Sequence, residues 1–541
     1  MLVSIDSYRG VKFVLRYLRE VPLAWFILGI GIARVGVFLS TACFGERRFV
    51  WLRRCAFAVG LLILCAYLAI TLDSLRCFLI QQDEANIISI AAASLRGLPM
   101  YHSPSSANLS YSLMYGPFTF LIYRVALVAG GINHFWVMRG AVVIASLAVC
   151  ATLFLLLRKF VSNFIAVALL TFPLSILLQH PENSMSIRSD IWIVLFSALA
   201  MLASFLEAEL LAVILTGILG GVIIGLKISA APAILFPLLV LYRRFGLRAT
   251  AYCLLTVVAF TLAPFALPNV SLHNYIAWIL FTRSEGLSAS SAFSNVLFAL
   301  FLVSPCLMME LYMRRFGLAF RHRVPEILII VLCLLMAVMT SKHGSGLHYL
   351  WHIVPSIVVY MALVARDIAA TIDEEREVPI YSIAVACTLF ACVYIPRAYG
   401  YVKISLMPPG VAVARQSIDR YLDLYRDHSS IQMGYGSVDG DYHTELRYVL
   451  VYRDQPYTLE GNTARFETKL LPFPVNVLKQ MDSCKDDVWL VPHGEKPFDL
   501  WVFRDSLRTT FLRDYAVDRT DGVYDAWVCN PARARSMLNE K

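Results

Sequence analysis

The sequence predicts a polytopic α-helical membrane protein, and three observations support this fold class. Of its 541 residues, 58% are hydrophobic and only 16% are charged, a balance that a water-soluble globule cannot accommodate. Apolar runs of about 20 residues, the length that crosses a bilayer as a helix, recur as far as residue 396. Residues 398–541 lack such a run and are rich in Asp, Arg, Tyr and Gly, which predicts a soluble domain after the last span.

Eleven segments are apolar and long enough to span the bilayer. They are residues 55–78, 134–157, 161–179, 188–206, 209–226, 229–242, 248–267, 291–313, 325–340, 346–365 and 378–396. Basic residues fall on alternate connections, which the positive-inside rule assigns to the cytoplasm. These residues are Arg47, Arg48, Arg53, Arg54, Arg158, Lys159, Arg243, Arg244, Arg248, Arg314, Arg315, Arg321 and Arg323. The opposite connections, and everything after residue 396, are then expected to be extracytoplasmic.

Residues 21–43 add a twelfth candidate helix, so the count is about 11 to 12. This segment carries Arg34 midway and follows the basic start formed by Arg9, Lys12, Arg16 and Arg19. A twelfth span would place that basic start outside, whereas a surface or re-entrant amphipathic helix agrees with the charge rule, and both alternatives stay open. The start lacks the cleavage site of a signal peptide. We therefore divide the chain into a basic segment (1–54), a transmembrane domain (55–397) and an extracytoplasmic α/β domain (398–541).

The first long outer loop, residues 79–133, is expected to carry two helices. Its early part has apolar and small residues at helical spacing and breaks at Gly97 and Pro99, which predicts a helix along the membrane surface. A second interfacial or half-inserted helix is expected after Tyr115 and Gly116, since Pro117 suits a first helical turn. Such a loop can roof a cavity.

Ionisable residues gather at the outer ends of several spans. The acidic pair Asp83 and Glu84 follows the first span, Arg188 and Asp190 begin the fourth, and Lys227 lies between two spans. Lys342, His343 and His348 surround the sequence SKHGSGLHY. Any one of these residues could be an interfacial anchor, because charged side chains reach water at helix ends. Charges inside a bundle usually mark chemistry or transport.

Asp73 and Arg76 lie in the last turns of the first span. They are three residues apart, a spacing that lets their side chains meet across one helical turn. We expect them to face the interior of the bundle as a structural ion pair.

In combination, several segments resemble the GT-C superfamily of membrane glycosyltransferases, which includes protein O-mannosyltransferases and lipid A aminoarabinose transferases. The resemblance rests on Asp83-Glu84, LRGLPMY and YGPFTFLIY within residues 95–123, RSDIW at 188–192, GLKISAAPAILFPLLVLYRR at 225–244 and SKHGSGLHYLWHIVP at 341–355. These motifs cover most of the membrane region in order. Two departures occur: His348 stands where many relatives have Asn, and Arg188-Ser189-Asp190 replaces an Arg-Pro-Asp sequence.

The resemblance implies an inverting transfer of a sugar from a polyprenyl-phosphate donor to a hydroxyl presented from outside. Asp83 would be the general base, with Glu84 and Asp190 as further catalytic acids. Lys227 is the first choice for binding the phosphate, and the other substrate-binding residues would be Arg188, Lys342, His343, His348 and Tyr115. A divalent cation (magnesium, manganese or calcium) on the carboxylates is left open. The relatives point to a bacterial inner membrane, with the site and the C-terminal domain facing the periplasm.

Topology agrees with this interpretation, because nucleotide sugars are cytosolic and would not meet carboxylates on the outer face. No Gly-rich phosphate loop followed by a soluble helix is present. The C-terminal domain is expected to contain helices at residues 417–425 and 475–481 and β-rich runs at 448–452 and 488–492. Its two cysteines, Cys484 and Cys529, are candidates for a disulfide in an oxidising compartment.

Two other classes remain open, a secondary transporter and a non-catalytic membrane scaffold. A transporter would favour broken helices matched between two halves, and no such internal symmetry is visible. The net charge of +9 is explained by cytoplasmic loops that meet anionic membrane lipids, so no nucleic-acid partner is expected. The sequence leaves open which sugar is donated and whether the acceptor is a glycan, a lipid or a protein.

Overall fold

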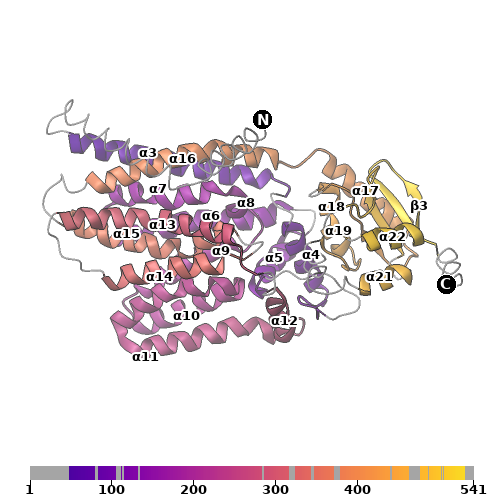
Figure 1. Ribbon diagram of the computed structural model, residues 1–541, viewed down its shortest axis with the longest axis horizontal. Coiled ribbons are helices and arrows are strands. Elements are labelled where there is room, and N and C mark those ends of the chain that lie inside the picture. The colour runs from indigo at the N-terminus through magenta and orange to yellow at the C-terminus, as the bar shows by residue number, and fades with distance from the viewer. Residues whose placement is uncertain are drawn as a thin grey trace, which may run out of the picture.

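The helices form an elongated bundle that carries a small sheet domain at one end (Figure 1). The computed structural model describes residues 48–79, 83–104, 111, 115–131, 135–282, 286–315, 323–342, 346–370, 378–438, 441–461, 475–484, 487–500, 503 and 505–530. The candidate helix at residues 21–43 and His343 lie outside these residues. Between the bundle and the sheet domain lie α4 and α5 (Figure 1).

The predicted spans correspond to apolar helices of the bundle. In chain order the bundle elements are α3 (Arg48–Asp73), η2 (Ser74–Arg76), α6 (Phe135–Arg158), α7 (Asn163–Gln179), α8 (Pro181–Ser184), α9 (Asp190–Ser204), α10 (Glu209–Leu226), η3 (Ile228–Ile234), α11 (Leu235–Leu262), η4 (Ala263–Ala266), α13 (Ala289–Arg315), α14 (Arg323–Met339), η6 (Leu347–Ile353), α15 (Val354–Ala369) and α16 (Val378–Ile404). Among the described residues, seven helices are long and apolar enough to cross a membrane. Three further predicted spans correspond to the shorter apolar helices α7, α9 and α14.

Two predicted spans, 229–242 and 248–267, are continuous in the structure apart from a break at Gly246. Within α11 this residue has φ 84°, in the left-handed region that favours glycine. The helix direction therefore changes at the residue where the sequence predicts a basic loop between two spans.

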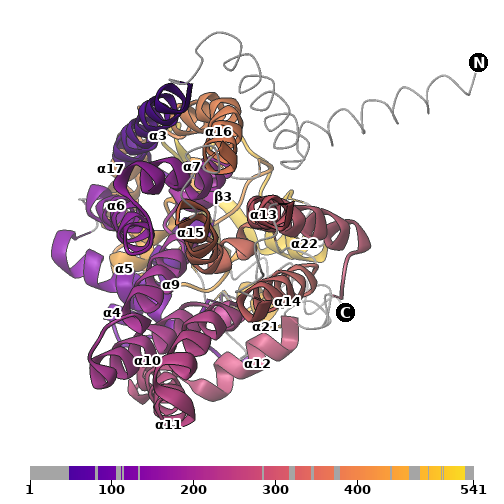
Figure 2. The ribbon, with the colours of Figure 1, turned by 90° about the vertical axis from the view of Figure 1, so that its left-hand side faces the viewer.

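Figure 2 looks along the bundle and shows two groups of helices. One side contains α3, α6, α7 and α16, and the other contains α10, α11, α12 (Leu272–Thr282) and α14. Between these groups run α9 and α15 (Figure 2), and α9 packs against both α6 and α10. The start of α9 is therefore held centrally, within reach of helix ends from both groups.

The outer loop contains the two predicted helices, α4 (Asp83–Leu95) and α5 (Pro117–Gly130). Proline occupies the first turn of α5, as expected. The first helix is not exposed as a membrane-surface helix would be, because all of its residues from Glu84 to Ser94 are buried. It packs between α5 and the C-terminal helix α19 (Arg447–Tyr452), so the sequence pattern of a surface helix corresponds here to a helix covered by another domain.

The Asp73–Arg76 ion pair is present, but its predicted place inside the bundle is wrong. The two side chains approach to 3.7 Å, and that of Arg76 is 81% exposed. After Asp73 the chain continues as the short 3₁₀ helix η2, in which Ser74 is buried and the Arg76 side chain faces solvent.

The C-terminal region folds around a four-stranded sheet. Its elements are α17 (Gly410–Leu424), β1 (Ile431–Met433), α18 (Tyr442–Glu445), α19, α21 (Val475–Asp482), β2 (Val488–Pro492), α22 (Asp505–Asp514), β3 (Tyr515–Thr520) and β4 (Tyr524–Cys529). The strand order is β1-β2-β4-β3, with β1 parallel to β2 and the other pairs antiparallel. Cys484 and Cys529 form a disulfide with their Cα atoms 5.7 Å apart, which confirms the predicted pairing.

One element of this region differs from the prediction. The run at residues 448–452, predicted to be β-rich, is helix α19. A short apolar run does not distinguish a strand from a buried helix, and here burial against α4 decides the outcome. The expected helices near 417–425 and 475–481 and the strand at 488–492 are present as α17, α21 and β2.

A buried polar network joins the C-terminal region to α4. Asn86 donates a hydrogen bond to Glu460 at 2.6 Å and accepts one from the Tyr457 hydroxyl at 3.0 Å. Beside them, Arg447 donates to Glu445 at 2.7 Å and to the Tyr435 hydroxyl. These groups are buried, so each needs its partner to offset the loss of water. The network couples the C-terminal domain to the helix that begins with Asp83.

Glu445 is expected to make stability depend on pH. Burial raises the pKa of Glu445 to about 7, with smaller contributions in the same direction from Glu460 and Asp83, against the opposing charge of Arg447. The folded state then holds a proton that the unfolded chain loses near pH 4.5, so stability is greatest below that pH and falls as pH rises towards 7. Between pH 4.5 and 7 the free energy of unfolding should fall by about 1–3 kcal/mol because of this group. Replacement of Glu445 by Gln is expected to remove that dependence on pH.

The measurement is the thermal unfolding of the purified full-length protein between pH 4.5 and 8. The matched control is Asp423→Asn, an exposed carboxylate of α17 that should leave the pH profile unchanged. A Glu445→Gln profile as steep as that of the wild type would contradict this assignment.

Candidate functional site

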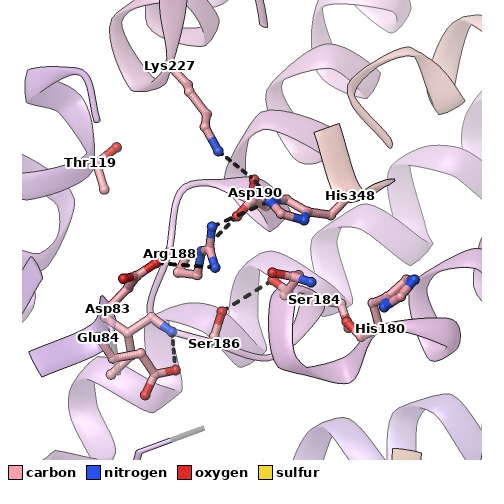
Figure 3. Close-up of polar contacts among 12 residues, drawn as sticks. Asp83, Glu84, Thr119, His180, Ser184, Ser186, Arg188, Asp190, Lys227 and His348 are labelled. Atoms are coloured by element: carbon pink, nitrogen blue, oxygen red, sulfur yellow. Dashed lines mark hydrogen bonds and ion pairs between the residues drawn. The ribbon is translucent and has the colours of Figure 1, made fainter. Parts of the chain in front are cut away.

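Charged side chains from three helix ends meet between the bundle and the outer loop. Asp83 begins α4, Arg188 precedes α9, Asp190 begins α9, and Lys227 follows α10. Figure 3 shows their contacts as a continuous row from Asp83 through Arg188 and Asp190 to Lys227, with His348 beside Asp190. The structure therefore brings together predicted site residues from motifs widely separated in the sequence.

Asp190 is the centre of this row. Its carboxylate is fully buried, with Lys227 Nζ 3.3 Å from Oδ1 and Arg188 Nε 3.1 Å from Oδ2. His348 and His352 each bring Nε2 to 3.8 Å from Oδ1. Its position at the N-terminus of α9 also favours a negative charge. Two cations are thus fixed around one buried anion.

Asp83 is the more accessible carboxylate of the site. Its side chain is 22% exposed, compared with 0% for both Glu84 and Asp190. Arg188 NH1 lies 3.5 Å from Asp83 Oδ2, so the same guanidinium contacts Asp83 and Asp190. Asp83 is therefore oriented by an arginine while part of its side chain remains exposed.

Two tyrosine rings surround the Lys227 ammonium. Lys227 Nζ lies 3.7 Å from the ring centre of Tyr349 and 5.1 Å from that of Tyr115. The Tyr115 ring also lies 5.8 Å from the Arg188 guanidinium carbon. Such rings attract a cation through their π faces and restrict its rotamers. The Lys227 head group is thus held between Asp190 and Tyr349 at a defined place.

Glycine makes the close approach of the outer loop to α10 possible. A Cβ on Gly116 would lie 2.1 Å from the Gly225 carbonyl oxygen, which no side chain can tolerate. At this contact the Gly116 N–H donates to the Leu226 carbonyl at 2.8 Å. Tyr115 precedes this contact and Lys227 follows it, so the YGP and GLK sequences position the aromatic ring against the lysine.

Glu84, predicted as a catalytic acid, lies beside the row but forms a separate buried ion pair. Both of its oxygens receive hydrogen bonds from Arg139 in α6, at 3.0 and 2.5 Å, and the Ile187 N–H donates to Oε1 at 2.7 Å. Arg139 also donates to the carbonyls of Phe78 and Met185. The pair links the end of the first span, α4, α6 and the chain before α9.

Sequence reasoning missed Arg139, His352 and Tyr349. Arg139 had a usable signal, since an arginine inside an apolar span usually has a buried partner or a function. His352 lies four residues after His348 in the same η6–α15 segment, and spacing alone does not show which of the two faces an acid. Nothing in the sequence marks Tyr349 as a site residue except its place next to His348.

The SKHGSGLHY motif supplies two further predicted residues, Lys342 and His343. Lys342 lies just after α14 and forms an isolated β-bridge with Leu287. His343 lies outside the described residues. The SKHGSGLHY motif therefore contributes His348 to the row around Asp190.

The carboxylates do not fit the divalent cation that the sequence left open. The oxygens of Asp190 face Arg188 and Lys227, and those of Glu84 face Arg139, so positive side chains hold the positions that a metal ion would need. Within the described part of the chain, no group of three or more His, Cys, Asp or Glu residues is arranged to hold a metal. No step below depends on a metal.

This arrangement can combine two kinds of chemistry. An accessible carboxylate can accept a proton from a bound hydroxyl, and two fixed cations can stabilise a phosphate. Arg188 joins the two parts of the site, because it contacts both Asp83 and Asp190.

Comparison with solved structures identifies the fold. The chain resembles ArnT from Cupriavidus metallidurans in the apo state (TM-score 0.54) and bound to undecaprenyl phosphate (TM-score 0.55), each at 14% identity over 87% of this chain and 98% of that chain. The Archaeoglobus fulgidus oligosaccharyltransferase in its apo form is matched with a TM-score of 0.44 at 10% identity, over 83% of this chain and 70% of that chain. No protein-family model and no curated protein matches the sequence. The chain therefore shares the fold of ArnT, in agreement with the polytopic helical fold class that the sequence predicts.

Proposed function

We propose that this protein is an inverting membrane glycosyltransferase that moves a sugar from a polyprenyl-phosphate donor to an acceptor hydroxyl. The observation that carries the proposal is the row in which accessible Asp83 is joined through Arg188 to the buried Asp190–Lys227 pair. In this proposal Asp83 is the base, and Arg188 and Lys227 beside it bind the phosphate. A transporter or a scaffold has no need for this combination.

Asp83 acts as the general base. One of its oxygens accepts the acceptor proton while the acceptor oxygen forms a bond to the anomeric carbon of the sugar. The bond from that carbon to the phosphate oxygen breaks, and polyprenyl phosphate leaves with the electron pair. Contact with the hydroxyl and partial removal of water make a weak carboxylate base effective here.

Arg188 and Lys227 stabilise the negative charge that grows on the departing phosphate. Both are held before the substrate arrives, Lys227 against Tyr349 and both against Asp190. Cations that are already oriented need little rearrangement in the transition state. Asp190 is a positioning residue in this scheme, because its fully buried carboxylate is enclosed by the cations it orients.

The donor class is supported by the fold as well as by the site. ArnT, which shares this fold, has been solved bound to undecaprenyl phosphate. A long polyprenyl chain suits a site at the edge of a bundle with apolar helices. We place the protein in a bacterial inner membrane, with the site and the C-terminal domain facing the periplasm, in agreement with the charge rule.

Replacement of Asp83 by Asn should abolish transfer with little effect on folding. The amide cannot accept the proton, so kcat/KM is expected to fall by about 10²- to 10⁴-fold. The measurement is transfer of radiolabelled sugar from a panel of polyprenyl-phosphate sugars to cell-envelope acceptors in proteoliposomes. The matched control is Asp73→Asn, the same change at the exposed ion pair of the first span.

Equal activity of Asp83→Asn and wild type would remove Asp83 from the mechanism. Absence of product from every donor, with a well-folded wild-type protein, would instead favour transport or a structural role.

Replacement of Lys227 by Met should slow the chemical step more than it weakens donor binding. If the ammonium interacts most strongly with the departing phosphate, kcat should fall by about 10²-fold or more. Steady-state kinetics with varied donor concentration separates this effect from a rise in KM, and Lys227→Arg should recover part of the rate. A rise in KM alone, at unchanged kcat, would assign Lys227 to ground-state binding.

Replacement of Glu84 by Gln tests whether this acid is structural. Loss of its charge leaves the buried Arg139 guanidinium without its counter-ion, which is expected to cost about 3 kcal/mol or more of stability. Thermal unfolding should show a lower Tm, while kcat for the fraction that remains folded stays near the wild-type value. A variant with unchanged Tm but no activity would return Glu84 to the chemistry.

A further inference from the structure

A second cluster of charged side chains lies at the end of the bundle opposite the Asp83 row. Here a surface pocket of about 390 Å³ is bounded by the start of α3, the end of α6, the turn before α7 and the end of α15. Its lining residues are Arg53, Arg158, Lys159, Phe160, Val161, Ser162, Ile165, Arg366 and Ala369. Four of these nine residues are cations, and the proposed reaction uses none of them.

Among the residues that the structure describes, ion pairs balance the positive charge of this pocket only in part. Arg366 pairs with Asp367 at 3.1 Å, and both side chains of that pair reach solvent. Arg53 lies 4.5 Å from the Phe164 ring, Arg158 5.8 Å from Phe154, and Lys159 5.9 Å from Phe205. Contacts with aromatic rings orient these cations without neutralising them. The pocket is therefore prepared for an anion.

The start of α7 adds to this preference. Ser162 lines the pocket as the N-cap of this 17-residue helix and makes no side-chain capping hydrogen bond. The backbone N–H groups of a first helical turn and the helix dipole both favour a negative group nearby.

The pocket lies at the depth of the lipid headgroups. Arg53 begins one apolar span (Arg53–Arg76), Arg158 ends another (Trp136–Arg158), and Arg366 is in the last turn of a third (Leu347–Ala369). The other ends of these spans lead to the Asp83 row. The charge rule assigns the basic end to the cytoplasm, where the leaflet is rich in anionic lipid.

We propose that this pocket binds the phosphate of an anionic phospholipid, such as phosphatidylglycerol, in the cytoplasmic leaflet. A free phosphate shares the charge chemistry, but apolar surface adjoins the cations. Phe164 beneath Arg53 is 39% exposed, and Leu155, one turn before Arg158, is 50% exposed. A cationic pocket bordered by exposed apolar side chains matches a charged head with acyl chains.

The test compares lipid binding by two variants that lose the same charge. Arg158→Gln/Lys159→Gln alters the pocket, while Arg243→Gln/Arg248→Gln removes two exposed cations from the same predicted membrane face outside it. Full-length protein in zwitterionic detergent is titrated with phosphatidylglycerol, phosphatidylcholine of the same acyl chains, or inorganic phosphate. Thermal unfolding reports stabilisation by any ligand that binds the folded state, and native mass spectrometry counts the bound lipids.

Phosphatidylglycerol should raise the Tm of wild type and of the control variant. The pocket variant should bind it roughly thirtyfold more weakly, the loss expected for two interfacial cations. Arg53→Gln, from a different helix, should weaken binding in the same direction. A cooperative thermal unfolding transition of each variant in the presence of phosphatidylcholine shows that the variant is folded.

Three outcomes would overturn the proposal. If both double variants lose binding equally, the effect is general surface charge. If phosphatidylcholine stabilises the protein as much as phosphatidylglycerol does, the pocket does not select an anionic headgroup and the proposal is wrong. If inorganic phosphate alone reproduces the whole stabilisation, an anion site is present but lipid is not its ligand.

Discussion

The buried ion pair between Glu84 and Arg139 constrains the geometry on which the site depends. Arg139 comes from the second predicted span, yet its guanidinium contacts Glu84 and the carbonyls of Phe78 and Met185. Glu84 in turn accepts from the Ile187 N–H, immediately before Arg188. One charge pair therefore sets the distance between the start of α4 and the start of α9. Because a buried charge without its partner is costly, this geometry is strongly preferred over alternatives.

That constraint gives neighbouring acids different environments. Asp83 and Glu84 are consecutive residues of one helix, so their side chains point in different directions. Glu84 faces the protein interior and Arg139, whereas Asp83 faces Arg188 and stays 22% exposed. Asp190 has a third environment, enclosed by two cations and two histidines. The division between an accessible acid and two buried ones follows from these partners rather than from residue type.

The C-terminal domain participates in this arrangement. Asn86, one turn after Asp83, is hydrogen bonded to Glu460 and Tyr457, and α19 covers α4. Burial of α4 is the reason why the surface helix predicted from its sequence is not exposed. The surface-helix prediction failed because the spacing of apolar residues identifies the apolar face of a helix but does not show which other elements cover its remaining faces. Short apolar runs such as 448–452 fail for a related reason, since strand and buried helix differ there only in their packing.

The sequence by itself determined that the chain crosses a membrane many times, where the spans lie and which charged residues share one face. Hydropathy and the distribution of Arg and Lys carry that information locally. Motif order also predicted a GT-C fold, and the chain shares its fold with ArnT. Tertiary structure alone decided that Arg139 pairs with Glu84 and that Asp190 contacts both Arg188 and Lys227. Glu84 and Arg139 are 55 positions apart, and Asp190 and Lys227 are 37 apart, so these contacts depend on how helices pack, which no local pattern records.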